Sequence, residues 1–319
     1  MRYFVILIFV MIFFACNKSN YYPKINPNTT YIAYNIHVPD TTKDDWEILT
    51  MDFEGNKKSN ITNHSDVAWT YTAYRDKLYF ISDRDSAYRH YYLYVSDYKG
   101  RNVKKVSNLR LEDSWMCTRN NGKEMIVSGR ENGNRFQLYL INTKDGKYHQ
   151  ITSDTAAMYR DPCFSPDGTQ IVCSYKPKRR DKTRHEELYI MDEYGNNLRQ
   201  LTHYPEDNIS AEGFGYKAGS ARWHPTANFI SYISQQDGKN SIFAITPDGS
   251  KQWKLIDNPD SEGWHDWSAD GKWLVYNGSD IDETQYHIFL MNWLTKQKKQ
   301  LTDNTYRSQL SPVFVEVRD

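Results

Sequence analysis

Charge of one sign is not in excess in this 319-residue sequence, because 40 lysine and arginine residues balance 40 aspartate and glutamate residues. A global electrostatic attraction to nucleic acid or to an acidic polymer is therefore not expected. Cysteine is also scarce, and the three cysteines after Cys16 lack metal-ligand spacing, so neither a metal centre nor a disulfide framework is predicted to hold the fold. Cys163 and Cys173 flank one predicted hairpin. We expect buried free thiols there, and a bond between the two is the alternative.

A hydrophobic run long enough to cross a membrane is missing too. The apolar stretch from Tyr3 to Ala15 has thirteen residues, whereas a spanning helix needs about 18 or more and an export signal needs fewer. We therefore predict that residues 1–15 are a signal peptide. Phe13-Phe14-Ala15-Cys16 resembles a bacterial lipobox, although Phe13 stands where an aliphatic residue is usual, so Cys16 is the predicted lipidation site. The alternative is ordinary cleavage that leaves a free cysteine.

These features predict a lipoprotein of the bacterial cell envelope. Asn17 is not the aspartate that marks retention at the inner membrane, which favours the outer membrane, with the protein facing the periplasm or the outside. Residues 16–30 would form a lipidated linker, and the lipid would be the only contact with the membrane. We expect a monomer.

Motifs of known catalytic chemistry are missing as well. The sequence contains no Gly-x-Ser-x-Gly, no His-Glu-x-x-His, no phosphate-binding loop and no local cysteine–histidine pair. We therefore predict no catalytic residue.

Aromatic residues, in contrast, are abundant. They make up 15% of the sequence, with 25 tyrosines, and they suit half-buried pleated strands better than helices. A two-residue motif recurs at intervals of 45, 45, 50, 54 and 46 residues, a period that is typical of arrays of small sheets. Its six copies are Ile61-Thr62, Val106-Ser107, Ile151-Thr152, Leu201-Thr202, Leu255-Ile256 and Leu301-Thr302.

Each repeat contains two hairpins. Turns that end in glycine precede most copies of the motif, as at 52–55, and a second turn, such as 165–168, lies near the start of each repeat. Short apolar segments without helical periodicity, such as 188–190, lie between the turns. Two hairpins give four strands, so six units predict an all-β, six-bladed β-propeller with four-stranded antiparallel blades over residues 31–319.

The repeat resembles that of the TolB-type propeller family, whose repeats are the WD40-like PD40 type. The resemblance rests on an aromatic-Ser-Pro-Asp-Gly turn, an apolar strand and then Leu-Tyr-Ile-Met-Asp…Gly…Leu-Thr, best matched over 164–202. It implies the fold and, less specifically, a binding role. The full TolB protein carries an α/β domain before its propeller. We expect that domain to be missing from this chain, because only about 15 residues separate Cys16 from the first strand.

The ring is predicted to close with its last strand. The first repeat begins directly at its second strand, 31–34, and Phe314 follows Thr302 by the same distance that separates Phe164 from Thr152. A C-terminal strand at Val313-Phe314 would complete the first blade and remove two free sheet edges.

Candidate binding residues lie where one repeat passes into the next, a position that lines one mouth of the channel in such propellers. Carboxylates from five blades beside a histidine would suit a divalent metal ion in the channel or a cationic ligand. The alternative is that they stabilise turns or pair with Arg160 and Arg222. No cofactor is required. The candidates are Asp66, Asp113, Arg160, Asp161, Glu262, Trp264 and His265, with His265 as the metal ligand.

Two insertions enlarge repeats four and five and are predicted to be neighbours on one face. The first is basic and contains Arg179 and Arg180; the second is rich in glycine and contains Glu212, Phe214 and Tyr216. Together they would bind an anionic glycan or the acidic surface of a partner protein, with the two rings stacking on sugars. The alternative is that both are solvated surface loops.

We therefore predict a non-enzymatic envelope protein that binds a protein or glycan partner. The alternative is a metal-dependent polysaccharide lyase, because Trp223-His224-Pro225 and Trp264-His265 weakly resemble the oligogalacturonate lyases. Six repeats instead of seven count against that alternative. His224 replaces a turn serine and is itself predicted to cap a hairpin turn.

Overall fold

The computed structural model describes residues 24–39, 45–205, 217–236, 239–256, 260–280 and 282–317. These residues form strands joined by turns and loops, and none of them belongs to a helix long and apolar enough to cross a membrane. The predicted signal peptide and Cys16 lie outside the described residues, as do Glu212, Phe214 and Tyr216.

The strands form six antiparallel sheets, and each blade is described from its innermost strand outward. Blade one contains β25 (Gln309–Glu316), β1 (Thr30–His37), β2 (Trp46–Asp52) and β3 (Ser59–Asn60), and blade two contains β4 (Ala68–Tyr74), β5 (Lys77–Ser82), β6 (Tyr92–Asp97) and β7 (Lys104–Lys105). Blade three contains β8 (Arg110–Leu111) and β9 (Cys117–Arg119), then β10 (Glu124–Glu131), β11 (Asn134–Asn142) and β12 (Tyr148–Gln150). Blade four contains β13 (Met158–Phe164), β14 (Gln170–Lys176), β15 (Glu187–Asp192) and β16 (Arg199–Gln200). Blade five contains β17 (Lys217–Trp223), β18 (Ile230–Gln236), β19 (Lys239–Ile245) and β20 (Gln252–Lys254), and blade six contains β21 (Ser261–Trp267), β22 (Trp273–Ser279), β23 (Tyr286–Asn292) and β24 (Lys298–Gln300).

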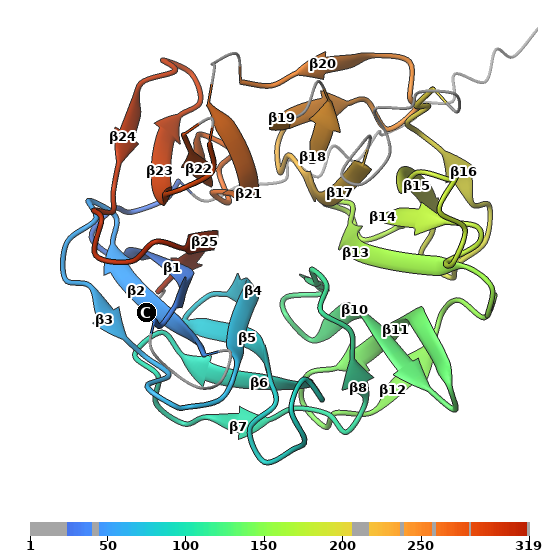
Figure 1. The fold of residues 1–319 in the computed structure, drawn as a ribbon, viewed down its shortest axis with the longest axis horizontal. Coiled ribbons are helices and arrows are strands. Elements are labelled where there is room, and N and C mark those ends of the chain that lie inside the picture. Colours follow the sequence, from blue (N-terminus) through green and yellow to red (C-terminus); the bar gives the residue numbers. More distant parts are fainter. Residues whose placement is uncertain are drawn as a thin grey trace, which may run out of the picture.

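The sheets surround a central axis, with β25, β4, β13, β17 and β21 nearest to it (Figure 1). The predicted six-bladed propeller is therefore confirmed. Blade three departs from the common pattern, because its inner strand is split into β8 and β9, which pair with opposite ends of β10.

The predicted ring closure is also confirmed. β25 pairs with β1, with Phe314 opposite Ile32 and Val313 opposite Ala33, so the two ends of the described chain share one sheet. Apolar side chains then fill the space between blades. Ile32 and Ile36 of blade one, for example, belong to the same buried cluster as Ile288 of blade six.

The recurring two-residue motif contacts the glycine turn of the next blade. A Cβ atom on Gly100 would lie 2.1 Å from the carbonyl oxygen of Ile61, and the equivalent atom on Gly146 would lie 2.0 Å from that of Val106. Both glycines also have a positive φ. The repeated residues are thus those at which one blade meets the next.

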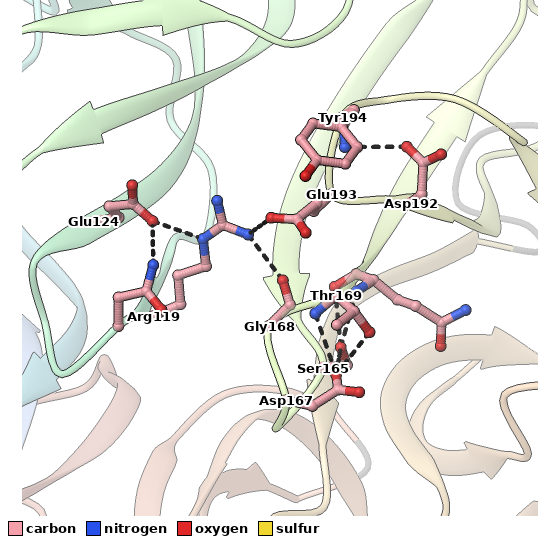
Figure 2. A network of polar contacts seen from close by, with 11 residues as sticks. Arg119, Glu124, Ser165, Asp167, Gly168, Thr169, Asp192, Glu193 and Tyr194 are labelled. Carbon is pink, nitrogen blue, oxygen red and sulfur yellow. Dashed lines mark hydrogen bonds and ion pairs between the residues drawn. The ribbon is translucent and has the colours of Figure 1, made fainter.

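A polar network joins the inner hairpin of blade three to both hairpins of blade four (Figure 2). The Arg119 guanidinium donates to Glu124 Oε2 in its own hairpin at 2.8 Å. It also donates to the Gly168 carbonyl oxygen at 2.8 Å and to Glu193 Oε2 at 2.5 Å, both in blade four. These bonds fix blades three and four against each other.

Deleting residues 308–319 should destabilise the whole domain. The deletion removes the buried side chains of Leu310, Val313, Phe314 and Val315, each worth about 2 kcal/mol, and exposes an edge of β1. We expect a loss of roughly 5 kcal/mol or more in the free energy of unfolding, measured by denaturant titration. Deleting only residues 318–319 is the control. A soluble truncated protein with unchanged stability would refute closure by β25.

Candidate functional site

The innermost strands share a β-bulge at one level of the channel. The pairing register with the second strand shifts once in each of β4, β13, β17 and β21. Such a bulge re-aims the side chains that it contains. The residues inside these shifts that line a common cavity are Tyr71, Asp161, Ser220, Gly263 and Trp264.

The Arg222 side chain extends from blade five across the channel and is almost completely buried. Its Nη2 donates to the carbonyl oxygen of Tyr71 in blade two at 3.0 Å. Its Nε lies 3.7 Å from Asp266 Oδ1 in blade six, and its Cζ lies 3.8 Å from the centre of the Trp115 ring in blade three. One guanidinium therefore joins four blades.

Two cavities lie at opposite ends of the inner strands. The first, which we call the acidic cavity, has a volume of about 420 Å³ and is lined by the N-terminal halves of β13, β17 and β21. The second, the thiol cavity, has a volume of about 580 Å³ and is lined by the C-terminal halves of the same strands, including Arg222. The ionisable and aromatic residues of the acidic cavity are Asp113, Asp161, Glu262, Glu283, Arg160, Lys217, Trp69, Tyr71, Trp115, Trp264, Tyr286.

Asp161 holds the wall of the acidic cavity together. Its carboxylate accepts hydrogen bonds from the backbone N–H groups of Trp115 in blade three and Ser220 in blade five, both at 3.0 Å. Burial opposes the charged form, but the Arg160 charge and these N–H groups outweigh it and lower the pKa of Asp161. Asp161 is thus a charged structural group shared by three blades.

Glu262 differs from Asp161 because only one of its oxygens is engaged. Oε2 accepts a hydrogen bond from the Ile242 N–H at 3.0 Å, whereas Oε1 has no hydrogen-bond partner among the described residues. The side chain is 1% exposed, and burial raises its pKa to about 7. Close to neutral pH, Glu262 therefore exists both as a carboxylate and as a neutral acid.

Three further polar atoms of residues that line this cavity lack a hydrogen-bond partner within the described part of the chain. They are Nε1 of Trp69, Nε1 of Trp115 and Nε of Arg160. Buried polar groups are normally hydrogen-bonded, so four such atoms around one cavity are a concentration that requires a reason.

Five of the residues predicted from the sequence meet at the acidic cavity: Asp113, Arg160, Asp161, Glu262 and Trp264. Asp66 does not line it, and its carboxylate lies 2.9 Å from Nδ1 of His64. In the basic insertion, the Arg179 N–H donates to the Ala156 carbonyl oxygen at 2.9 Å, while the Arg180 side chain is exposed. The described flanks of the two insertions do meet, since the Ala218 N–H donates to the Glu186 carbonyl oxygen at 2.9 Å.

The two candidate histidines lie away from the mouth of the channel. His265, which the sequence placed at that mouth, is 1% exposed, and its Nε2 lies 2.7 Å from Ser231 Oγ behind the wall of the acidic cavity. Burial and the nearby Arg222 charge lower its pKa to about 3. His224 caps a turn, as predicted, because its Nδ1 accepts hydrogen bonds from the Thr226 and Ala227 N–H groups.

A metal ion in the channel would need ligands that the described residues do not bring together. Within the described ranges, no three His, Cys, Asp or Glu side chains are grouped so that they could hold one. The side chains expected to do so make other contacts, as His265 does with Ser231. A divalent metal therefore does not fit the described part of the channel.

The sequence indicated the carboxylates but missed what arranges them. Tyr71 and Trp115 were not among its candidates, and Arg222 was named only in the alternative in which the carboxylates pair with arginines. The bulges that bring five residues to one cavity were not predicted either. A possible signal was the small residues beside the bulges, such as Gly219, where an added Cβ would lie 3.0 Å from Asp161 Oδ2.

Comparison with known proteins supports the fold. Residues 72–314 match the family model described as the TolB beta propeller domain, PD40. The chain is 25% identical over 150 residues to dipeptidyl-peptidase 5 of Porphyromonas endodontalis, and this covers 44% of the chain but only 20% of that protein. The chain thus spans about a fifth of that relative.

Solved structures are similar over most of the chain. TolB from Acinetobacter baumannii has a TM-score of 0.70 at 14% identity, covering 91% of this chain and 67% of that one. An oligogalacturonate lyase in complex with manganese has a TM-score of 0.53 at 13% identity, covering 86% and 78%. At these identities the likeness shows the fold alone.

Replacing Glu262 by glutamine should stabilise the protein above neutral pH and not in acid. Because folding raises the pKa from 4.5 to about 7, ionisation of Glu262 costs stability progressively between pH 4.5 and 7, and the whole cost is present above pH 7. The Glu262→Gln protein should therefore gain up to about 3 kcal/mol at pH 8 and nothing at pH 4.5, measured by denaturant titration at each pH. The exposed Glu54→Gln is the control. An equal difference at both pH values would contradict this explanation.

Proposed function

The chain belongs to the TolB beta-propeller family, and from that premise we propose that it is a non-enzymatic binding protein of the bacterial cell envelope. In this proposal the acidic cavity receives a segment of a partner protein that carries a lysine or arginine side chain. Membership of the family and the likeness to TolB support a protein-binding propeller.

The envelope location rests on the first residues of the sequence. Residues 1–15 would direct export, Cys16 would carry the lipid, and residues 16–30 would connect the lipid to the propeller as a monomer at the outer membrane. The proposal requires no cofactor.

The observation that carries the binding role is the set of unsatisfied polar atoms around the acidic cavity. Leaving a buried donor or acceptor without a partner costs about 1–3 kcal/mol. Glu262 Oε1 is such an acceptor, and the Nε1 atoms of Trp69 and Trp115 are such donors. A peptide segment supplies both N–H donors and carbonyl acceptors, so its insertion would satisfy groups of both kinds.

The charge of the cavity favours a cationic side chain in that segment. The carboxylates of Asp113, Asp161, Glu262 and Glu283 outnumber the cations Arg160 and Lys217 on its wall. The half-buried Trp264 ring adds an aromatic face, which attracts ammonium and guanidinium groups. The same charge disfavours an acidic glycan in the cavity. A glycan is therefore better placed at the basic insertion, where Arg179 and Arg180 remain candidates together with Glu212, Phe214 and Tyr216.

A stability cost at the site agrees with a role in binding. Ionising the buried Glu262 side chain lowers the stability of the folded protein, and a glutamine at this position would avoid that loss. The sequence nevertheless has a glutamate here. Groups with strongly shifted pKa values are concentrated at functional sites.

Photo-crosslinking tests the proposed site. A photoreactive amino acid in place of Tyr286, on the cavity wall, should give one discrete protein adduct in the cells that produce the protein. The same amino acid in place of Tyr194, whose side chain is 70% exposed on an outer turn, is the matched control and should not give that adduct.

Second substitutions identify the chemistry of the contact. Glu262→Gln in the Tyr286 background should lower the adduct yield about tenfold or more, because a buried charge-assisted hydrogen bond is lost. Arg179→Glu with Arg180→Glu should leave the yield unchanged. If Arg179→Glu with Arg180→Glu abolishes the adduct and Glu262→Gln does not, the partner binds at the basic insertion and not in the acidic cavity. An adduct with a saccharide would show that the partner is a glycan and not a protein.

A further inference from the structure

Two thiols from different blades lie in contact at the thiol cavity. Cys117 is on β9 of blade three and Cys163 is on β13 of blade four, and their sulfur atoms are 3.5 Å apart. They are 46 residues apart in the sequence. The alternative predicted for the hairpin paired Cys163 with Cys173, but in the structure Cys173 is a separate, completely buried thiol.

Contacts on both sides of the pair hold the thiols in place. The Arg119 network, two residues after Cys117, ties the inner hairpin of blade three to Gly168 and Glu193 of blade four (Figure 2). The Arg119 guanidinium also lies 4.5 Å from the centre of the Phe164 ring, next to Cys163. The two sulfur atoms are therefore neighbours because the interface between the blades is fixed.

The pair can be reached from solvent. Cys117 and Cys163 both line the thiol cavity, which has a volume of about 580 Å³ and is also lined by Arg222 and Asp266. Cys117 is only partly buried. Cys173, in contrast, does not line this cavity.

The surroundings activate one of the two thiols. The hydrogen bond with Cys117 and the charge of Arg222 lower the pKa of Cys163, although burial opposes the change. The pKa of Cys117 is raised by its hydrogen bond with Cys163 and by burial. Cys163 is thus the better nucleophile, because the thiolate is the form that attacks a disulfide.

We propose that Cys117 and Cys163 form a reversible disulfide that joins blades three and four. To form the bond, the two sulfur atoms must approach from 3.5 Å to about 2.05 Å. Neither cysteine lines the acidic cavity, so this proposal is independent of the proposed binding function.

The oxidant is a small-molecule or protein disulfide. The Cys163 thiolate attacks one of its sulfur atoms and expels the other as a thiolate, which leaves a mixed disulfide on Cys163. Cys117 then loses its proton and attacks the Cys163 sulfur, displacing the second thiolate. One S–S bond is lost in the oxidant and one is gained in the protein, two electrons pass to the oxidant, and two protons go to its thiols.

Disulfide mapping tests the proposal directly. The full-length protein is equilibrated in reduced and oxidised glutathione at about −180 mV, digested without reduction and analysed by mass spectrometry. We expect one linked pair of peptides that contains Cys117 and Cys163. Recovery of both peptides as free thiols, or of Cys163 linked to Cys173, would overturn the proposal.

Thermal unfolding supplies a second measurement with a matched control. Oxidation should raise the Tm by roughly 5 °C or more, since the bond closes a long loop in the unfolded chain. The rise should persist in Cys173→Ser and vanish in both Cys117→Ser and Cys163→Ser. A rise of equal size in Cys117→Ser would also contradict the assignment, because oxidation would then act elsewhere.

Discussion

The Arg222 guanidinium is the constraint on which the channel depends. It is buried, pairs with Asp266, donates to the Tyr71 carbonyl oxygen and stacks on Trp115, so it fixes the relative positions of four blades. It also lines the thiol cavity and contacts Tyr71 and Trp115, which line the acidic cavity. Burial lowers the pKa of His265 and the hydrogen bond with Cys117 lowers that of Cys163, and the charge of Arg222 adds to both effects. Removing a buried charge of this kind would leave Asp266 without its partner, which is costly.

The architecture was predictable because the repeat consists of the residues that bring blades together. Ile61 and Val106 contact the turn glycines of the following blades, and those contacts recur with the period of the fold. The closing strand was predictable for the same reason, since Phe314 keeps the spacing of Phe164. A contact that recurs in each blade produces a recurring residue pattern, which can be recognised in a single sequence.

The candidate site was only partly predictable, because it depends on features that differ between blades. Asp161 and Glu262 could be named from their positions, but opposite roles follow from contacts: Asp161 receives two backbone N–H groups, and Glu262 has one oxygen without a partner in the described chain. His265 was placed at the channel mouth, yet the bulge in β21 puts Trp264 on the cavity wall and His265 against Ser231. Cys117 and Cys163 occupy equivalent positions in adjacent repeats, each five residues before a turn glycine. The equivalent residues of blades five and six are Arg222 and Asp266, so the repeat pattern alone does not single out a pair of thiols.

The proposed binding role depends on one contact, in which a cationic side chain of the partner meets the Glu262 carboxylate. The most direct measurement is the affinity of the crosslinked segment, as a synthetic peptide, before and after its lysine and arginine residues are replaced by glutamine. At pH 8 the replacement should weaken binding about tenfold or more, and at pH 5, where Glu262 with its pKa of about 7 is neutral, the difference should shrink. Equal affinities of the two peptides at pH 8 would contradict the proposed contact.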